Sequence, residues 1–444
     1  MKLFLLSLLG VCLHAQVTDY TLLRIGQGAK VLPVGTGANL LLDSTGIPAG
    51  TPGPHLFIKF PTLPPGATSE CYAETAYTQN CQVYPAGSNQ WRIYNANGVG
   101  TPLIRILGLP VGTHAIKLET TAGSVQKSIT YNVTIEPVPN PKSNPALARW
   151  QQVMLKGAAK FCPTPAFNWG TFSWEGHGWF YDGGRAYLNI YKWTGDERWK
   201  ECGLNLLNQW TDHIVAYGGK LKGYHVFTRG LLDAYRLTGD EKYRNAIKLL
   251  ATTGATRSSS LPADMYIREA AFALDSFNDY ERSGLGKHPD TERAVDNLIN
   301  ILTRILRDKS YTLHESFFDH LAAHALIDRY ELDGDPRIPG VIKMIADWTY
   351  DVAWNPATGK LIYNPDPVGP TCANGCQVYY PNLINLATPM YPWLARVLGD
   401  QSYAAKGDDM FAKSLIYEPT WSGKEFMQNY RWSFDYVYWR YGIR

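Results

Sequence analysis

The period of the hydrophobic pattern changes near residue 140. Before it, short runs of alternating or β-branched residues are separated by turn signals rich in Gly, Pro and Thr. After it, apolar residues recur at the spacing of amphipathic helices. A period of about two residues is typical of half-buried strands and one of about 3.6 residues is typical of helices. The pattern therefore predicts a β-domain followed by an all-α domain.

The first domain, residues 16–137, is predicted to be an antiparallel β-sandwich of the immunoglobulin-like type. Its strand signals lie at 56–60, 90–94, 103–107, 114–119 and 128–135. The last two runs flank Ala122-Gly123 and form the clearest hairpin signal. A proline-rich stretch at 138–143 is typical of a semi-rigid linker.

One helix-turn-helix junction recurs through residues 144–444. Its copies lie at 191–196, 235–240, 330–335 and 396–400, with a looser version at 280–290. In the four clear copies a Gly suits the left-handed end of one helix, and the Asp after it suits the N-cap of the next. Repeats of this kind are typical of stacked helical hairpins.

Around these junctions the pattern predicts twelve helices paired into six hairpins. They are expected near residues 144–161, 177–193, 196–216, 224–238, 240–253, 265–283, 290–308, 316–333, 336–353, 379–398, 401–416 and 424–441. The second helix of each hairpin is more apolar or richer in small residues, whereas several first helices carry the polar stripe of a surface helix. We therefore expect an inner ring of helices surrounded by an outer ring.

On these repeats, junctions and aromatic loops, residues 144–444 resemble the six-hairpin (α/α)6 toroid superfamily of carbohydrate-active enzymes. That superfamily includes glycoside hydrolases, polysaccharide lyases and sugar epimerases, and a β-sandwich ahead of such a toroid is familiar among them. The resemblance implies a multidomain fold and a saccharide ligand. It carries over no catalytic residue, because no specific family motif is present, and fold alone does not establish an activity.

Composition narrows the class of ligand. The 444 residues carry a formal net charge of only +3 and are 45% hydrophobic, which indicates folded domains and disfavours nucleic acid or an anionic membrane as a partner. All of the 14 Trp except Trp91 fall at or after Trp150. The helical part is therefore chemically distinct. No cofactor is predicted, and the oligomeric state is left open.

The N-terminus has the pattern of a secretory signal. Lys2 precedes an apolar run at 3–13, and cleavage is expected after Ala15. Cys12 suggests a lipoprotein as the alternative, but Val11 stands where a lipobox normally has a small residue. No later stretch approaches 18 uninterrupted apolar residues. We expect a secreted or periplasmic protein without stable membrane insertion.

Six cysteines remain after the signal, a number that an oxidising compartment can pair. Close spacing predicts two local disulfides, Cys71–Cys81 and Cys372–Cys376. Cys162 and Cys202 are predicted to stay unpaired. With helices of about 18 residues, alternation would place them near opposite helix ends, some 27 Å apart at about 1.5 Å per residue, beyond the roughly 7 Å Cα limit of a disulfide. No Cys/His set has the spacing of a structural zinc site.

Helix alternation predicts that the Gly-Asp junctions share one face of the ring and that six longer connections share the other. The first of these connections, residues 167–182, is the densest in aromatic residues. There, Trp174 and Trp179 offer faces for pyranose rings and Asp182 can bind hydroxyls. The alternative is that these tryptophans are buried as hydrophobic core that closes the end of the toroid.

The remaining connections supply further candidates for catalysis and substrate binding. These are His225, Arg229, Tyr266, Arg268, His314, Glu315, His320, Tyr380, Trp421, Asn429 and Arg431. Arginines here suit uronate carboxylates, with ordinary ion pairing at helix starts as the alternative. The spacing of His320 and His324 suits a metal, but Leu321 replaces the Glu of a zinc-protease helix, so no metal site is predicted. Residues 425, 428, 429 and 432 form one helical stripe that faces either the centre or solvent.

Three functions fit this sequence. Hydrolysis of a glycosidic bond needs two carboxylates, and Glu175 and Glu315 lie on connections expected to face each other across the ring. A lyase acting on uronic-acid glycans would instead use a base from the Tyr/His set that includes His225, Tyr266 and His314. The third possibility is a glycan-binding or surface-structural protein without catalysis. Hydrolysis of a poly- or oligosaccharide bound in the toroid is the leading prediction.

Overall fold

The computed structural model describes most of the helical region and parts of the N-terminal region. The described residues are 31–33, 39–41, 56–65, 67–73, 81–83, 90–93, 102–107, 109–110, 112–122, 125–136, 144–162, 181–260, 266–308, 315–363, 379–380, 383–414 and 423–441. They fall into two compact units that divide within one strand, between Val133 and Thr134, and residues 31–33 belong to the second unit. The predicted signal peptide and the linker at 138–143 lie outside the described residues.

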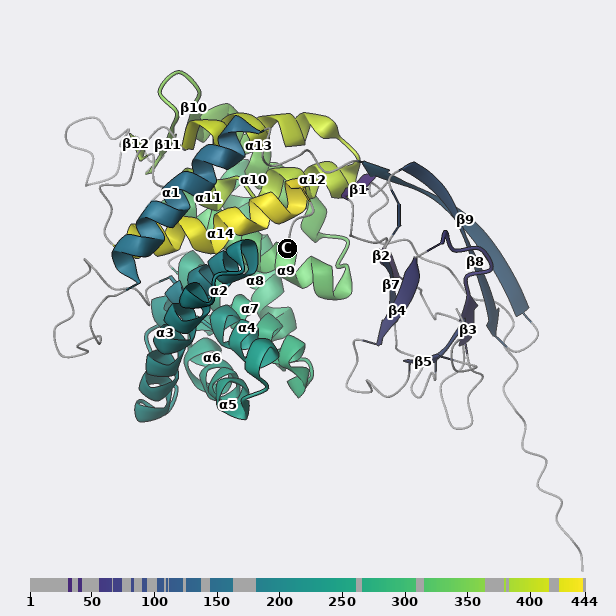
Figure 1. Cartoon of the computed structure of the whole chain (residues 1–444), viewed down its shortest axis with the longest axis horizontal. Coiled ribbons are helices and arrows are strands. Elements are labelled where there is room, and N and C mark those ends of the chain that lie inside the picture. Colours follow the sequence, from purple (N-terminus) through teal and green to yellow (C-terminus); the bar gives the residue numbers. More distant parts are fainter. Residues whose placement is uncertain are drawn as a thin grey trace, which may run out of the picture. The chain divides into compact units, whose positions relative to one another are not determined.

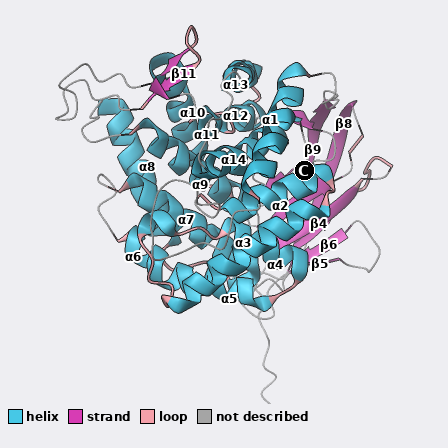
Figure 2. Cartoon of the chain, turned by 60° about the vertical axis from the view of Figure 1, so that its left-hand side comes forward, coloured by secondary structure: helices cyan, strands magenta, loops and turns pink. Residues whose placement is uncertain are grey.

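The N-terminal region forms β-sheets, as its alternating pattern predicts (Figures 1 and 2). Its strands are β1 (Val31–Pro33), β2 (Asn39–Leu41), β3 (Leu56–Lys59), β4 (Thr68–Ala73), β5 (Cys81–Val83), β6 (Gln90–Ile93), β7 (Pro102–Leu107), β8 (Gly112–Ala122) and β9 (Val125–Glu136). A six-stranded sheet has the order β1-β9-β8-β3-β6-β5, and a three-stranded sheet has the order β2-β7-β4. The neighbouring β8 and β9 confirm the predicted hairpin. Strand β1 pairs with β9 in parallel, so the six-stranded sheet is not wholly antiparallel as predicted. The immunoglobulin-like sandwich stays a prediction.

The second unit is helical. Its α-helices are α1 (Pro145–Phe161), α2 (Gly183–Thr194), α3 (Glu197–Ala216), α4 (Arg229–Thr238), α5 (Glu241–Leu250), α6 (Thr256–Ser259), α7 (Ile267–Tyr280), α8 (Thr291–Asp308), α9 (Ser316–Asp333), α10 (Ile338–Trp348), α11 (Ile384–Ala387), α12 (Met390–Leu398), α13 (Gln401–Ser414) and α14 (Gly423–Tyr441). Helices α2, α4, α7, α9, α12 and α14 contact one another in that order, and α14 contacts α2 again. This closed inner ring confirms the toroid.

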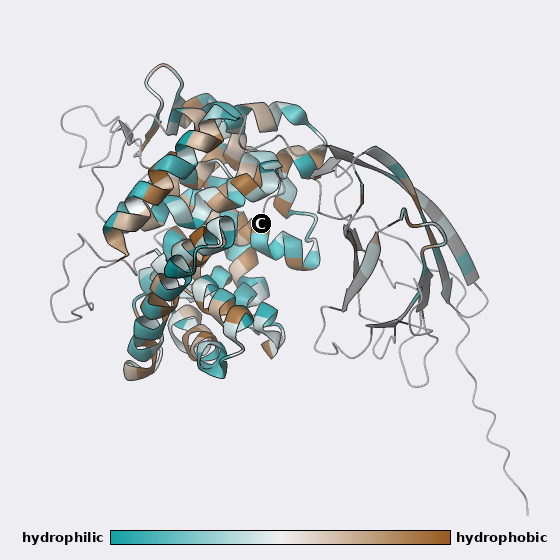
Figure 3. Ribbon diagram, in the orientation of Figure 1, coloured by the Kyte–Doolittle hydropathy of each residue, from teal (hydrophilic) through white to brown (hydrophobic). Residues whose placement is uncertain are grey.

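Burial separates the two rings. The inner helix α7 is buried on all sides from Glu269 to Asp279, whereas the outer helix α8 buries only a stripe that includes Leu298, Leu302 and Ile305. The mixture of brown and teal positions along single helices in Figure 3 shows the same amphipathic pattern. An inner helix must be apolar or internally paired because it has neighbours on every side.

The junctions adopt the conformation that their sequence predicts. Gly195, Gly239, Gly334 and Gly399 have φ between 70° and 71°. A Cβ at Gly195 or Gly239 would meet nothing within 4 Å, so the positive φ rather than space favours glycine there. The Asp that follows each glycine accepts a backbone N–H at the start of the next helix or just before it, as Asp196 does from Arg198 at 3.0 Å.

Three predicted helix boundaries are wrong. Helix α2 begins at Gly183 rather than 177, and α4 begins at Arg229 after a 3-10 turn at Gly223–His225. The expected helix at 379–398 starts instead with strand β12 (Tyr379–Tyr380), which pairs with β11 (Lys360–Ile362) beside β10 (Trp354–Asn355). Backbone pairing with Leu361 and Ile362 outweighs local helix propensity at the two tyrosines.

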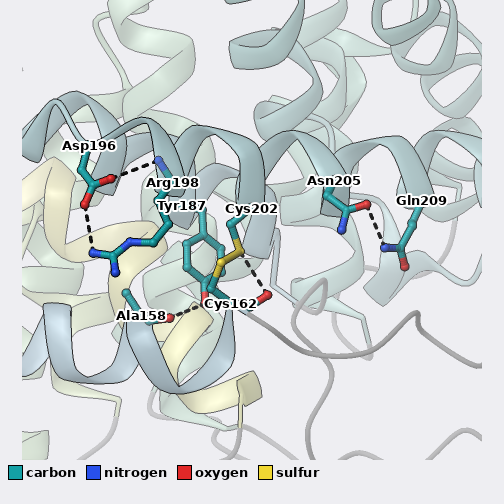
Figure 4. The surroundings of a disulfide bond; sticks show 8 residues. All are labelled: Ala158, Cys162, Tyr187, Asp196, Arg198, Cys202, Asn205 and Gln209. Carbon is teal, nitrogen blue, oxygen red and sulfur yellow. Dashed lines mark hydrogen bonds and ion pairs between the residues drawn. A yellow bond between two sulfur atoms is a disulfide. The ribbon is translucent and has the colours of Figure 1, made fainter.

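The prediction that Cys162 and Cys202 stay unpaired is also wrong, because the two form a disulfide with their Cα atoms 5.7 Å apart (Figure 4). Helix α2 has 12 residues, not 18, so the ends of the first hairpin are closer than expected. The Tyr187 hydroxyl donates to the Ala158 carbonyl at 3.2 Å, which places the last turn of α1 beside the early turns of α2. Gly203 packs against the same turns, its Cβ position lying 3.0 Å from the Gly184 carbonyl oxygen.

Candidate functional site

Residues from all six long connections meet at one end of the inner ring. We call this set the mouth; its described members are Tyr181, Tyr224, Arg268, Glu269, Glu315, Phe318, Tyr363 and Lys424. The Lys424 Nζ lies 5.7 Å from the centre of the Tyr181 ring, and the Arg268 guanidinium lies 5.0 Å from the Tyr224 ring and 5.3 Å from the Phe318 ring. For the described residues, this confirms that the connections between junctions gather on one face.

Tyr181 occupies the centre of the mouth. Its ring packs against Phe227, Phe272 and Trp432 at centroid distances of 6.1, 6.4 and 5.8 Å. Burial raises the pKa of Tyr181 to about 12, so its hydroxyl keeps its proton at neutral pH. Arg268, Glu315, Arg431 and Glu269 all act electrostatically on this hydroxyl. Charged groups from α7, from α14 and from the N-cap of α9 therefore act on this one residue.

Asp182 fixes the backbone beneath Tyr181. Among the described non-glycine residues, only Tyr181 and Asp182 have positive φ, at 55° and 63°. The Asp182 Oδ2 accepts the Gly230 backbone N–H at 2.8 Å, and the residue is only 3% exposed. Burial raises the pKa of this carboxyl, and Arg431 and Arg185 oppose the shift. Asp182, predicted to bind substrate, is thus committed to a bond within the protein.

Arg268 and Glu269 form a pair at the start of α7. The Arg268 Nε and Nη2 both donate to the Glu269 Oε1, at 3.2 and 2.6 Å. The Arg268 side chain is 28% exposed and that of Glu269 is 9% exposed. Arg268, which the sequence predicts to bind substrate, therefore stays accessible at the mouth.

Glu315 is held by the small sheet that follows α10. It precedes α9, and its Oε2 accepts the Tyr363 hydroxyl at 2.9 Å. The next residue, Ser316, donates its backbone N–H to the Tyr363 carbonyl at 2.8 Å and its hydroxyl to the Ile362 carbonyl. Two connections thus cooperate to fix this carboxylate at the mouth.

Below the mouth, the inner ring encloses buried ion pairs. Arg229 donates to Asp279 at 2.5 Å and also to Asp328, so it serves as an internal counter-charge rather than a free substrate ligand. Arg431 is 2% exposed and donates from Nη2 to the Asp275 Oδ2 at 3.1 Å, while its Nε and Nη1 have no hydrogen-bond partner among the described residues. Burial raises the pKa of Asp275 to about 7.

The predicted histidines and amide are largely committed within the protein. His225 packs edge-on against Tyr224, and burial lowers its pKa to about 3. The Nε2 atoms of His320 and His324 face the Thr349 hydroxyl at 3.0 Å and the Leu386 carbonyl at 2.8 Å. Asn429 donates to the Glu425 carbonyl and accepts from Asn385. No group of three metal-ligating side chains occurs among the described residues.

The helical stripe on α14 faces the centre. Gln428, Asn429 and Trp432 are 3%, 2% and 1% exposed. Of the two orientations that the sequence allows for this stripe, the structure therefore has the one that faces the centre. Tyr266 stands just before α7 and is 36% exposed. The structure therefore brings together Tyr266, Arg268, Glu315 and Arg431 near this end, from three of the inner helices, α7, α9 and α14.

Several predicted residues lie outside the described residues. They are Trp174, Glu175, Trp179, His314, Trp421, Cys372 and Cys376; for Tyr380, Cys71 and Cys81 only the backbone is described, in β12, β4 and β5. The opposition of Glu175 and Glu315 and the two local disulfides stay predictions. Sequence reasoning did not select Tyr181, Glu269, Phe318, Tyr363 or Lys424. The adjacent charges of Arg268-Glu269 at a helix start were the one available signal.

No protein family and no curated protein matches the sequence. Solved structures with a similar fold include an unsaturated glucuronyl hydrolase specific for heparin, at 10% identity and a TM-score of 0.49, covering 66% of this chain and 97% of that one. A variant of an unsaturated glucuronyl hydrolase from Streptococcus agalactiae matches at 13% identity and a TM-score of 0.48, covering 70% of this chain and 97% of that one. A polysaccharide lyase matches at 11% identity and a TM-score of 0.43, covering 93% of this chain and 64% of that one.

These similarities concern the fold, and at such identities they assign no residue and no substrate. The closed ring of inner helices, read from the contacts of this chain, has the architecture of the six-hairpin (α/α)6 toroid superfamily. Among the described residues, no helix combines the length and apolar character needed to cross a membrane.

Proposed function

We propose that this protein is an exported carbohydrate-active enzyme that binds a poly- or oligosaccharide at the mouth and hydrolyses a glycosidic bond. The observation that carries the proposal is the convergence of Arg268, Glu269 and Glu315 around the Tyr181 ring. Saccharide sites combine aromatic faces, which cover the C–H faces of sugar rings, with charged and polar groups that bind hydroxyls. The signal-peptide pattern at residues 1–15 supports export.

Glu315 is the carboxylate that we assign to catalysis. Glycoside hydrolysis uses one carboxyl group as the acid that protonates the leaving oxygen and a second that attacks the sugar or activates water. Among the described residues, Glu315 stands at the mouth in one hydrogen bond, from Tyr363, whereas Glu269 is paired with Arg268. Glu175, on the first connection, is the proposed second carboxylate.

A uronate-directed lyase is the second candidate. Such a reaction needs a cation near the sugar carboxylate and a base beside it. Arg268 and Lys424 supply cations at the mouth. His225 is a poor base because its pKa is lowered to about 3, which leaves Tyr266 as the described tyrosine of the predicted set.

One screen separates these functions. The purified protein is incubated with neutral and uronic-acid polysaccharides while reducing ends and the absorbance of unsaturated uronate are both recorded. A hydrolase releases reducing ends without that absorbance, and a lyase produces both. Glycan binding without either signal would show that the protein binds saccharides but does not cleave them, and this result would overturn the proposal.

Variants then test the residue assignment. Glu315→Gln should abolish turnover and retain glycan binding, because the amide keeps the shape but cannot act as acid, base or nucleophile. Glu241→Gln is the matched control, since Glu241 pairs with Arg244 near a junction, at the other end of the inner helices. If the Glu315→Gln variant keeps full turnover, Glu315 is not catalytic.

A further inference from the structure

Arg268 is held so that one edge of its guanidinium group remains available to a ligand. Its Nε and Nη2 donate to a single oxygen of Glu269, at 3.2 and 2.6 Å. The edge formed by Nη1 and the second hydrogen of Nη2 makes no hydrogen bond to any described residue. Two parallel N–H groups on such an edge match the two oxygens of a carboxylate.

Aromatic rings restrict how a ligand can approach this arginine. The guanidinium carbon lies 5.0 Å from the Tyr224 ring centre and 5.3 Å from that of Phe318. Contacts with two rings and one carboxylate orient the plane before a ligand arrives, which lowers the entropy cost of binding. The side chain remains 28% exposed, so its free edge can be reached.

Positive charge extends from Arg268 toward the centre of the ring. Lys424 and Arg268 act electrostatically on each other, and burial lowers the pKa of Lys424. Arg431, which also acts on Tyr181, is nearly fully buried and has two nitrogens that make no hydrogen bond within the described part of the chain. Glu269 and Glu315 also lie among these groups. The pair of Arg268 with Glu269 has no net charge, so Lys424 and Arg431 supply the further positive charge.

We propose that Arg268 binds the carboxylate of an acidic saccharide through its free guanidinium edge and thereby selects uronate-containing glycans over neutral ones. This inference rests on the proposed function, because it assumes that the mouth is a saccharide site. It names the substrate class and the residue that sets it. Glu269, Tyr224 and Phe318 are positioning residues that hold the guanidinium in place.

The test uses pairs of glycans that differ only at the carboxylate. Uronate-containing oligosaccharides and the same oligosaccharides with their carboxyl groups reduced to alcohols are titrated against the full-length protein by calorimetry. The unmodified protein should bind the acidic member at least about tenfold more tightly, the discrimination expected when a bidentate charged partner is removed. Equal affinity for both members, or binding to neither, would overturn the proposal.

Substitutions assign the discrimination to Arg268. Arg268→Gln should bring the ratio of affinities close to one while affinity for the reduced glycan changes little. Arg268→Lys retains the charge but loses the planar fork, so most of the discrimination should disappear. Arg244→Gln is the control, because Arg244 also contacts a tyrosine and a glutamate, with 29% of its side chain exposed, but lies near a junction. Thermal melting of each variant checks folding.

The outcomes for binding and for turnover are separable. Acid-selective binding that depends on Arg268 supports this inference even when no polysaccharide is cleaved, in which case the proposed hydrolysis alone fails. Cleavage of glycans without acid preference supports hydrolysis and overturns the inference. A ratio that stays unchanged in the Arg268→Gln variant also overturns it.

Discussion

The carboxylate of Asp182 accepts the backbone N–H of Gly230 and joins the starts of two neighbouring inner helices, α2 and α4. Both groups are buried, and the bond satisfies an amide in the first turn of α4 that has no partner within its own helix. Tyr181, the residue before Asp182, lies at the centre of the mouth. The position of that ring therefore depends on this bond.

Replacement of Gly230 by Ala should destabilise the protein by about 2–4 kcal/mol through overpacking and loss of this bond. A Cβ at Gly230 would overlap the Asp182 Oδ1 and lie 2.9 Å from the Leu207 Cδ2. Gly340→Ala is the matched control, because a Cβ at that helical glycine meets nothing within 4 Å; this variant should be neutral or more stable by up to about 1 kcal/mol. Denaturant unfolding measures both, and equal effects of the two substitutions would show that close packing at Gly230 is unimportant.

The disulfide between Cys162 and Cys202 closes a loop with a sequence separation of 40 residues. In the chain-entropy treatment, a loop of that length stabilises the folded state by up to about 4 kcal/mol. The double variant Cys162→Ala, Cys202→Ala should therefore unfold at lower denaturant concentration. Peptide mapping without reduction should recover the linked peptides from the unmodified protein. A reductant should lower the stability of the unmodified protein by more than that of the double variant, in which only the two predicted local disulfides can still be reduced; free thiols at both positions would contradict the structure.

The junctions could be predicted because they are local. Gly195 and Asp196 need only their own backbone conformation and a neighbouring amide, and both requirements are visible in six residues of sequence. The closed ring followed from their repetition. The pairing of Cys162 with Cys202 could not be predicted, because it depends on the length of α2 and on how α1 and α3 pack along it.

The candidate site was predicted only in its location. The connections that meet at the mouth could be named from helix alternation, but the partners of each charge could not. Arg229 pairs with Asp279 and Asp328, which lie 50 and 99 residues further along the chain. Only the packing of three inner helices shows that this arginine is an internal counter-charge, whereas Arg268 keeps an accessible edge.

Stability should depend on pH through Asp275. Burial raises its pKa from an ordinary 3.8 to about 7, with Arg431 opposing the shift. Between about pH 4 and pH 7 the folded state holds a proton that the unfolded state has released, so the contribution of this group to stability falls as pH rises and its full cost is present above about pH 7.

Asp275→Asn removes this pH-dependent cost. The stability of the variant relative to the unmodified protein should rise between pH 4 and pH 8, by on the order of 2–4 kcal/mol. Denaturant unfolding across this range measures the difference. Asp351→Asn, at a side chain that is 65% exposed, should leave the pH profile unchanged. A difference between Asp275→Asn and the unmodified protein that does not vary with pH would contradict the assignment.

Tyr363 should act as a positioning residue for Glu315 in the proposed hydrolysis. Its hydroxyl donates to the Glu315 Oε2 at 2.9 Å, and its backbone carbonyl accepts from Ser316, so both residues hold the loop before α9. Tyr363→Phe removes only the hydroxyl. The carboxylate then loses its orienting bond, and kcat should fall about tenfold with little change in KM, because the substrate-binding surface keeps its shape.

Tyr235→Phe is the control, since the Tyr235 hydroxyl makes a similar bond, 3.1 Å long, to Glu241 near a junction. Steady-state kinetics on a cleaved glycan compares the two variants. If both variants retain the kcat of the unmodified protein, Tyr363 does not position the catalytic carboxylate; if Tyr363→Phe raises KM alone, the hydroxyl contributes to substrate binding instead.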